Sequence, residues 1–171
     1  MKRLLNLTTI ILLVVCNYAV SQTGNHLDFK GVEINGSSQD FVKNLKTKGF
    51  SDMMSMGLPI AGGATAFIGR FLDSESTIVL LESPKTKSLY AVVVMYPYGG
   101  KYSYDDLNEI YSRKYGKADS DNRFHVKGVN GDDIGLIFFE VGDNSILIWY
   151  RDKANWEIQV KEVKEIESDE I

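Results

Sequence analysis

The chain has 171 residues, with 23 Asp and Glu against 19 Lys and Arg, for a formal net charge of −4 at pH 7. An acidic chain without a block of basic residues argues against nucleic acid and anionic membrane surfaces as partners. The length suits one domain with a genuine core, and no run beyond the first 21 residues is apolar and long enough to cross a bilayer.

The first 21 residues have the pattern of an export signal. Two basic residues open the chain, and residues 4–16 are mostly apolar. Ala19 and Ser21 then place small residues at −3 and −1 of a cut before Gln22. We therefore expect a cleaved signal peptide, a single mature domain over residues 22–171, and a periplasmic or secreted location, with no transmembrane segment after cleavage.

Cys16 is the only cysteine, and it lies within the apolar part of the signal. We favour a small hydrophobic role for it. The alternative is a lipidated cysteine at a lipoprotein N-terminus, but Val15 stands where that processing needs a small residue. A cut after Ser21 removes the thiol, which excludes disulfides, thiol catalysis and cysteine-ligated zinc from the mature protein.

The first helical pattern begins at Ser37, whose hydroxyl can cap free backbone N–H groups. Asp40 lies in the first turn, where the helix dipole favours a negative charge. Phe41 and Leu45 form an apolar stripe. Basic residues followed by Gly49 are typical of a helix end, because glycine adopts the left-handed conformation there.

A second helical pattern has the same plan. Ser103 can cap it, and Asp105 and the aspartate after it lie in its first turn. Leu107 and Tyr111 belong to its apolar stripe. Basic residues again precede a glycine, Gly116.

Each helical pattern is followed by three runs rich in Val, Ile, Phe and Tyr, which predict strands. They cover residues 66–72, 77–82 and 88–96, then 123–127, 134–141 and 145–151, and a short strand is expected at 27–34 before the first helix. Turn formers separate the runs, as at residues 73–75 and 142–144. The apolar residues of the tail 156–167 fit either a helical stripe or a strand alternation, and its Glu and Lys content favours a short helix.

This order predicts an α+β fold. We expect a tandem α-β-β-β repeat, with sub-repeats at about 37–96 and 103–151, that forms an antiparallel sheet with helices packed on one face. Trp149 and Trp156 are expected in the core or at its edge.

Three segments carry a resemblance: residues 26–36 leading into Phe41, residues 114–117, and residues 150–155. Together they resemble an uncharacterised family of small secreted proteins common in gut Bacteroidetes-type bacteria, over most of the mature chain. The resemblance implies an exported bacterial protein and supplies no catalytic residues. The paired helix-and-sheet layout is also similar to β-lactamase inhibitor proteins and other small envelope modules, an analogy of fold that does not fix function.

No motif in the chain points to catalysis. His26 and His125 do not have a metal-binding spacing, and no Gly-x-Ser-x-Gly elbow is present. We interpret His125 as a hydrogen-bonded strand residue, and Asp105 and Asp106 as helix-start residues rather than a carboxylate pair. The sequence therefore predicts no enzyme and no cofactor.

The segment from Asp119 to Asn122 begins like a calcium loop. Position five is then Arg123, which cannot ligate calcium, and the glycine and terminal glutamate of such a loop are missing. We interpret this segment and the turn at residues 130–133 as solvated turns, with no metal site expected. Opportunistic calcium binding stays open for both.

A tyrosine-rich turn is the best surface candidate. Tyr98, Tyr102 and Tyr104 can offer stiff, amphipathic contact area, although a local packing role is the alternative. Met53 and Met54 can add an adaptable contact surface, or lie under the sheet edge instead. We expect a non-enzymatic exported module that binds an unknown protein partner in the bacterial envelope or outside the cell; the alternative is a carrier or sensor of a small apolar ligand or glycan.

Overall fold

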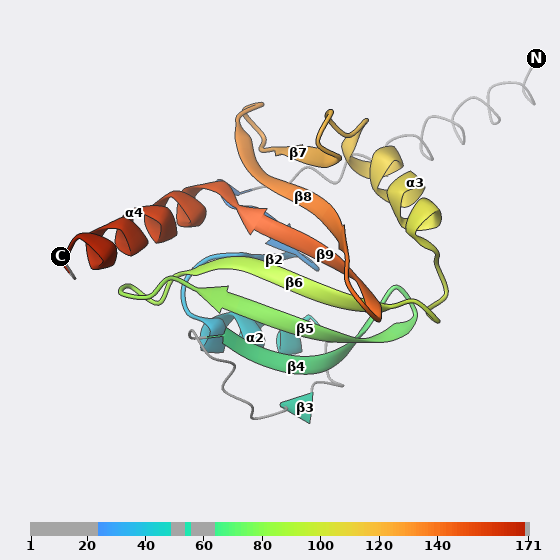
Figure 1. Cartoon of the computed structure of the whole chain (residues 1–171), viewed down its shortest axis with the longest axis horizontal. Helices are drawn as coiled ribbons and strands as arrows, with labels where there is room; N and C mark the ends of the chain where they lie inside the picture. Colours follow the sequence, from blue (N-terminus) through green and yellow to red (C-terminus); the bar gives the residue numbers. More distant parts are fainter. Residues whose placement is uncertain (1–23, 49–53, 56–63, 170–171) are drawn as a thin grey trace, which may run out of the picture.

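A helix followed by long strands occurs twice along the chain (Figure 1). The computed structural model describes residues 24–48, 54–55 and 64–169. The helices are α2 (Ser38–Thr47), α3 (Tyr104–Tyr115) and α4 (Lys153–Asp169). The strands are β1 (Asp28–Phe29), β2 (Val32–Glu33), β3 (Met54–Ser55), β4 (Ala64–Phe71), β5 (Ser74–Glu82), β6 (Leu89–Pro97), β7 (Arg123–Lys127), β8 (Asp133–Val141) and β9 (Ser145–Asp152).

The main sheet is antiparallel and has the strand order β3-β4-β5-β6-β9-β8-β7. The last strand of each half, β6 and β9, therefore lie side by side at the centre. Their register pairs Val92 with Tyr150 and Val94 with Ile148. The expected α+β class and antiparallel sheet are confirmed.

One face of this sheet carries the core. The hairpin β1–β2 and the helices α2 and α3 pack against it, and Figure 1 shows α2 behind β4 and β5. Their contributions to the core are Phe29 from β1, Phe41 and Leu45 from α2, and Leu107 and Tyr111 from α3, all at most 5% exposed. Burying one such side chain stabilises the fold by about 1.5–3 kcal/mol. The placement of helices on one face is thus seen for α2 and α3, whereas α4 projects from the end of β9.

The predicted helix starts are confirmed at atomic detail. Ser37 is the N-cap of α2, and its Oγ accepts a hydrogen bond from the Asp40 backbone N–H at 3.2 Å. Ser103 caps α3 and forms a capping box with Asp106, whose carboxylate accepts from the Ser103 N–H at 2.9 Å. At the other end of α3, Gly116 has φ 88° and is the C-cap.

Three predicted boundaries are wrong. Residues 27–34 form a hairpin rather than one strand, because Lys30 and Gly31, at φ 56° and 75°, make a tight two-residue turn. The β4–β5 turn lies at Leu72 and Asp73 rather than at residues 73–75, and both residues have positive φ. The tail helix α4 spans 17 residues and begins directly after β9, so it is not short.

Asp152 fastens the N-terminal segment to the start of α4. Its buried carboxylate accepts hydrogen bonds from the Asn155 N–H at 2.9 Å and the Leu27 N–H at 2.8 Å, and it lies 3.1 Å from His26 Nδ1. The Asn155 side chain donates to the Ile34 carbonyl at 2.9 Å. This network satisfies groups that would otherwise be costly to bury, and it gives His26 a structural role.

In the described part of the chain, no helix combines the length and apolar character that a bilayer crossing needs.

Candidate functional site

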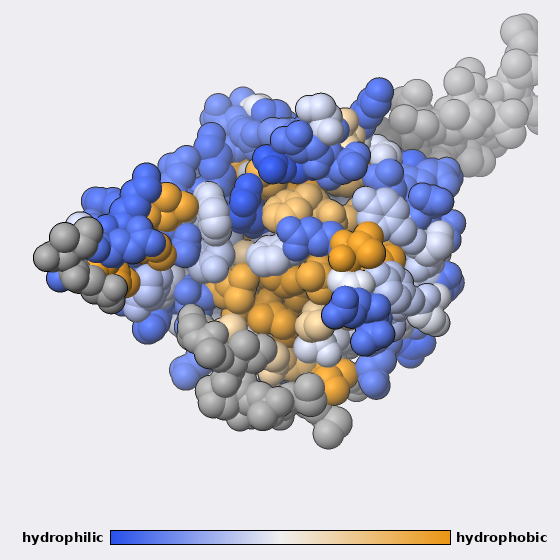
Figure 2. All heavy atoms as spheres, in the orientation of Figure 1, coloured by the Kyte–Doolittle hydropathy of each residue, from blue (hydrophilic) through white to orange (hydrophobic). Residues whose placement is uncertain are grey.

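The sheet face opposite α2 and α3 carries apolar side chains that are not fully covered. Figure 2 shows apolar surface in the middle of this face, with hydrophilic residues around it. We call it the open face and define it by the partly exposed residues Ile68, Val79, Leu81, Met95, Leu136, Phe138, Leu147 and Trp149. A contiguous exposed apolar patch with a polar border is typical of an interaction surface.

The central cross-strand row of the open face spans six strands. It runs Ala66, Val79, Val93, Trp149, Phe138 and Arg123. Small or β-branched residues occupy the β4, β5 and β6 positions of this row, and aromatic rings occupy the β9 and β8 positions. The side chains of this row are therefore small and aliphatic on β4, β5 and β6, and large and aromatic on β9 and β8.

An arginine and three aromatic rings form a stacked group at the aromatic end. The Phe138 and Trp149 rings are parallel, with an interplanar angle of 6° and centroids 5.6 Å apart. The Arg151 guanidinium lies 5.4 Å from the Phe138 centroid and 4.6 Å from that of Trp156, which belongs to α4. Trp149 Nε1 donates to the Glu140 carboxylate at 3.0 Å, which fixes the indole.

The charge of Arg151 is not neutralised locally. Within the described residues, no carboxylate pairs with its guanidinium. Burial lowers the pKa of Arg151, and the positive charge of Arg123 lowers it further. Arg151 stays protonated, but its charge is partly desolvated and has no counterion within the described part of the chain. A carboxylate from outside could supply one through paired N–H donors.

The tyrosines of the tyrosine-rich turn differ in exposure. Tyr98 is 49% exposed, and its hydroxyl donates to the Gly142 carbonyl. Tyr102 and Tyr104 are partly buried and pack against the core, with the Tyr104 ring edge-on to Phe139 at 5.8 Å. Of the predicted methionine contacts, Met53 lies outside the described residues, and Met54 is described only as a residue of β3.

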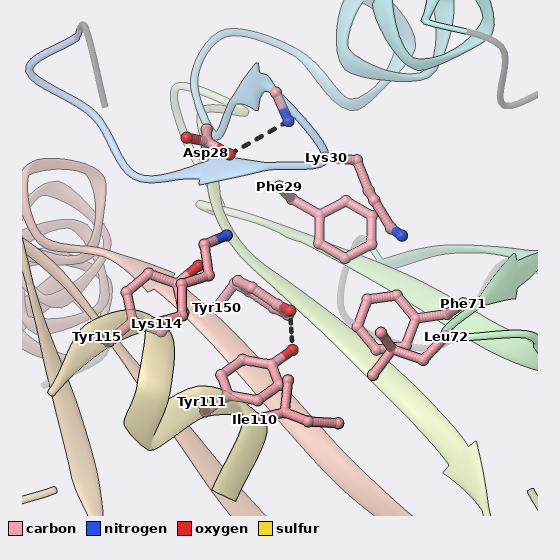
Figure 3. Close-up of a pocket in the computed structure, with 11 residues that line it drawn as sticks. Asp28, Phe29, Lys30, Phe71, Leu72, Ile110, Tyr111, Lys114, Tyr115 and Tyr150 are labelled. Atoms are coloured by element: carbon pink, nitrogen blue, oxygen red, sulfur yellow. Dashed lines mark hydrogen bonds between the residues drawn. The ribbon is translucent and has the colours of Figure 1, made fainter. Parts of the chain in front are cut away.

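A pocket of about 260 Å³ opens between the β1–β2 hairpin, α3, the β4–β5 turn and β9 (Figure 3). We call it the aromatic pocket; its lining is Asp28, Phe29, Lys30, Gly31, Phe71, Leu72, Ile110, Tyr111, Lys114, Tyr115 and Tyr150. The Tyr111 and Tyr150 hydroxyls hydrogen-bond to each other. No sequence pattern pointed to this pocket, because its walls come from segments up to 122 residues apart, Asp28 and Tyr150 being the most distant (150 − 28).

His125 is held between two aspartates. Its Nδ1 lies 2.8 Å from Asp133 and its Nε2 3.0 Å from Asp119, and these hydrogen bonds raise the pKa of His125. The other Asp119 oxygen accepts from the backbone N–H groups of Asp121 and Arg123, as in an ordinary turn. The described residues contain no group of three or more His, Cys, Asp and Glu side chains arranged to hold a metal ion.

Sequence reasoning missed the role of β9 in the open face. Trp149 was expected at the core or its edge, and it lies partly exposed on the outer side of the sheet. The signal was present: Ile146, Ile148 and Tyr150 are buried, while Leu147 and Trp149 between them are also apolar. Apolar residues at both alternations predict a strand covered on both sides.

No family model, curated protein or solved structure matches this chain. The resemblance to small secreted bacterial proteins therefore stays a prediction.

Proposed function

We propose that this protein is an exported, non-enzymatic module that binds a partner protein in the bacterial envelope or outside the cell, and that it does so with the open face. The observation that carries the proposal is the guanidinium of Arg151, which stacks on Phe138 and Trp156 and pairs with no carboxylate among the residues that the structure describes. Trp and Arg are enriched among the residues that dominate binding energy at protein interfaces. The Trp149 indole and the Arg151 guanidinium are already held in place, so binding a partner would cost little additional side-chain entropy.

The partner we propose is a protein surface with an apolar patch and an Asp or Glu that meets Arg151. The apolar patch would cover Val79, Met95 and Leu147, and the carboxylate would neutralise the charge that the stacked group leaves uncompensated. Tyr98 lies at one end of the sheet and would contribute at the rim, whereas Tyr102 and Tyr104 support the core packing of α3. This moves the centre of the binding surface from the tyrosine-rich turn to β9.

We also propose that the two helix-and-strand sets arose as a tandem repeat. The order β4-β5-β6-β9-β8-β7 supports this, because each set contributes three neighbouring strands and the two sets meet at their last strands. Both helices begin with a serine cap, and both pack on the same sheet face.

The first test uses a photo-crosslinking residue placed at Leu147 or, as control, at Val129, which is 56% exposed on the β7–β8 turn. The protein is produced in the cells that carry its gene, and the envelope and culture fluid are irradiated. We expect one protein to crosslink through position 147 and not through position 129. Crosslinks of equal yield at both positions, or crosslinks to a second copy of this chain, would contradict the proposal.

Variants of the bait then test the chemistry of the interface. Leu147→Lys and Arg151→Glu are expected to weaken capture of the crosslinked protein by at least about tenfold, since buried contacts at interface centres contribute about 2 kcal/mol or more. Val129→Lys is the matched control and leaves capture unchanged. Replacing the partner's Asp or Glu by Lys is expected to restore its binding to the Arg151→Glu variant. If no such charge exchange restores binding, the proposed ion pair is wrong.

A further inference from the structure

The floor of the aromatic pocket holds a buried hydrogen-bond donor that is not used. Tyr111 is 5% exposed and Tyr150 is 6% exposed. Their two hydroxyls carry two protons, and the bond between them uses one. Within the described residues, neither oxygen has another partner. Burial raises the pKa of both tyrosines, so both hydroxyls stay protonated at neutral pH and one O–H remains available to an acceptor.

The charged residues of the pocket favour an anion. Lys30 and Lys114 both line it, with Lys30 Nζ 4.9 Å from the Phe71 ring centroid and Lys114 Nζ 4.8 Å from that of Tyr115. Asp28 is the one acidic residue in the lining, and it accepts a hydrogen bond from the Gly31 N–H. Burial lowers the pKa of Lys30 and the charge of Lys114 lowers it further, while the charge of Asp73 acts in the opposite direction.

The backbone at the pocket mouth is strained. Lys30 has φ 56° and Leu72 has φ 45°, a region that side chains other than glycine adopt rarely. Both residues line the pocket, from the β1–β2 turn and the β4–β5 turn. Strained residues that gather around one cavity are typical of functional sites. The strained turns bring an ammonium group and an apolar side chain to the mouth of the same pocket (Figure 3).

The size and walls of the pocket define the rest of the ligand. At about 260 Å³ the pocket exceeds the ~150 Å³ cavity that holds benzene, so it has room for one ring and a short polar group. Its walls include Phe29 and Phe71, whose rings stack with centroids 5.8 Å apart, and Tyr150 edge-on to Phe29 at 5.0 Å. Such walls prefer an aromatic guest, because offset and edge-to-face ring contacts add to the burial of apolar area.

We infer that the aromatic pocket binds a small acid made of one aromatic ring and one carboxylate. The ring lies against Phe71, Leu72 and Ile110. The carboxylate accepts the unused tyrosine O–H and is attracted by the ammonium groups of Lys30 and Lys114, which both line the pocket. This site is on the opposite side of the sheet from the open face, so it stands or falls independently of partner binding.

Phenylacetate is the probe, and isothermal titration calorimetry with amide NMR shifts is the measurement. We expect a Kd between about 10 μM and 1 mM, as suits a ligand of this size. The neutral isostere phenylacetamide and the aliphatic acid octanoate are each expected to bind about tenfold more weakly or worse. Equal affinity for the acid and the amide would overturn the anion site, tighter binding of octanoate would overturn the aromatic class, and no saturable binding would overturn the inference entirely.

Variants locate the site and separate it from folding. The double variant Lys30→Gln, Lys114→Gln is expected to lose phenylacetate affinity about tenfold or more, since a charge-assisted contact is removed. Lys161→Gln on α4, where the lysine is 80% exposed, is the matched charge control and keeps full affinity. Ile110→Trp fills the pocket and is expected to abolish binding while the amide spectrum stays that of a folded protein. Undiminished affinity in either pocket variant, once its fold is confirmed, would overturn the site.

Discussion

His125 links two segments by its charge. Asp119 precedes β7 and Asp133 begins β8, and the imidazole lies between their carboxylates. Because the pKa of His125 is raised above its ordinary value near 6.5, the folded state favours the protonated ring. This contribution to the free energy of unfolding is fully present below about pH 6.5 and is lost as the pH rises through the raised pKa. The side chain is 45% exposed, so water screens the pair and the effect is small.

We therefore expect His125→Gln to lower the melting temperature more at about pH 5.5 than at about pH 9, where the wild-type ring is neutral too. Melting curves at the two pH values check this, with Lys127→Gln on the same strand as control. An NMR titration should place the imidazole pKa above 6.5. A difference in melting temperature that does not change with pH would show that the aspartates bind the neutral ring equally well.

At the scale of elements, α4 is fastened at two points. Asp152 caps its first turn, and Glu162, only 5% exposed, reaches the turn between β5 and β6. The Glu162 carboxylate accepts from the Lys85 N–H at 2.7 Å and the Thr86 N–H at 3.2 Å. The helix thus closes a turn that lies far from it in the sequence.

Replacing Glu162 by Gln should loosen this turn, since a neutral amide offers one acceptor oxygen in place of two charged ones. We expect hydrogen exchange of the Lys85 and Thr86 amides to accelerate, together with that of the second half of α4. Glu165→Gln is the control, because the carboxylate of this exposed residue pairs, among the described residues, with the side chains of Lys85 and Lys161 and with no backbone N–H of the turn. Unchanged hydrogen-exchange rates of the Lys85 and Thr86 amides would show that the turn is stable without the Glu162 carboxylate.

Elements governed by local chemistry could be predicted from the sequence. The caps at Ser37 and Ser103 involve residues three positions apart, so a short window contains the whole interaction. The turn at Leu72 and Asp73 could not, because Leu72 is a residue that rarely adopts the left-handed conformation it has here. Pairing of β4 with β5 over eight residue pairs imposes that conformation against local preference. For the same reason, the residues that form the open face and the aromatic pocket could not be named from the sequence, because both sets depend on the order of the strands.

At the scale of the whole molecule, the two halves depend on each other. Val92 and Val94 of β6 pair with residues of β9, so the boundary between the two halves runs through the core. Phe29 of β1 also packs against Tyr150 of β9, the last strand. Each half alone would leave the edge of β6 or of β9 unpaired and would lose part of its core.

We expect residues 22–100 and residues 101–171, produced separately, to lack cooperative thermal unfolding. Mixed in equal amounts, they should regain the circular dichroism and the amide spectrum of the intact protein. A cooperative transition in either half alone would show two independent domains instead of the single domain expected from the length. Mixing at several concentrations separates reassembly from slow folding of one half, because only reassembly depends on concentration.

Buried and exposed side chains alternate along the edge strand β7, and this affects how the protein associates at high concentration. Phe124 and Val126 point inward, while Arg123, His125 and Lys127 are exposed, and the pairing with β8 is irregular at Val126 and Lys127. Outward charges and a bulge make a strand a poor template for hydrogen bonding to a neighbouring chain. Addition of a strand from a neighbouring chain is thereby disfavoured at this edge, although the open face leaves apolar side chains partly exposed.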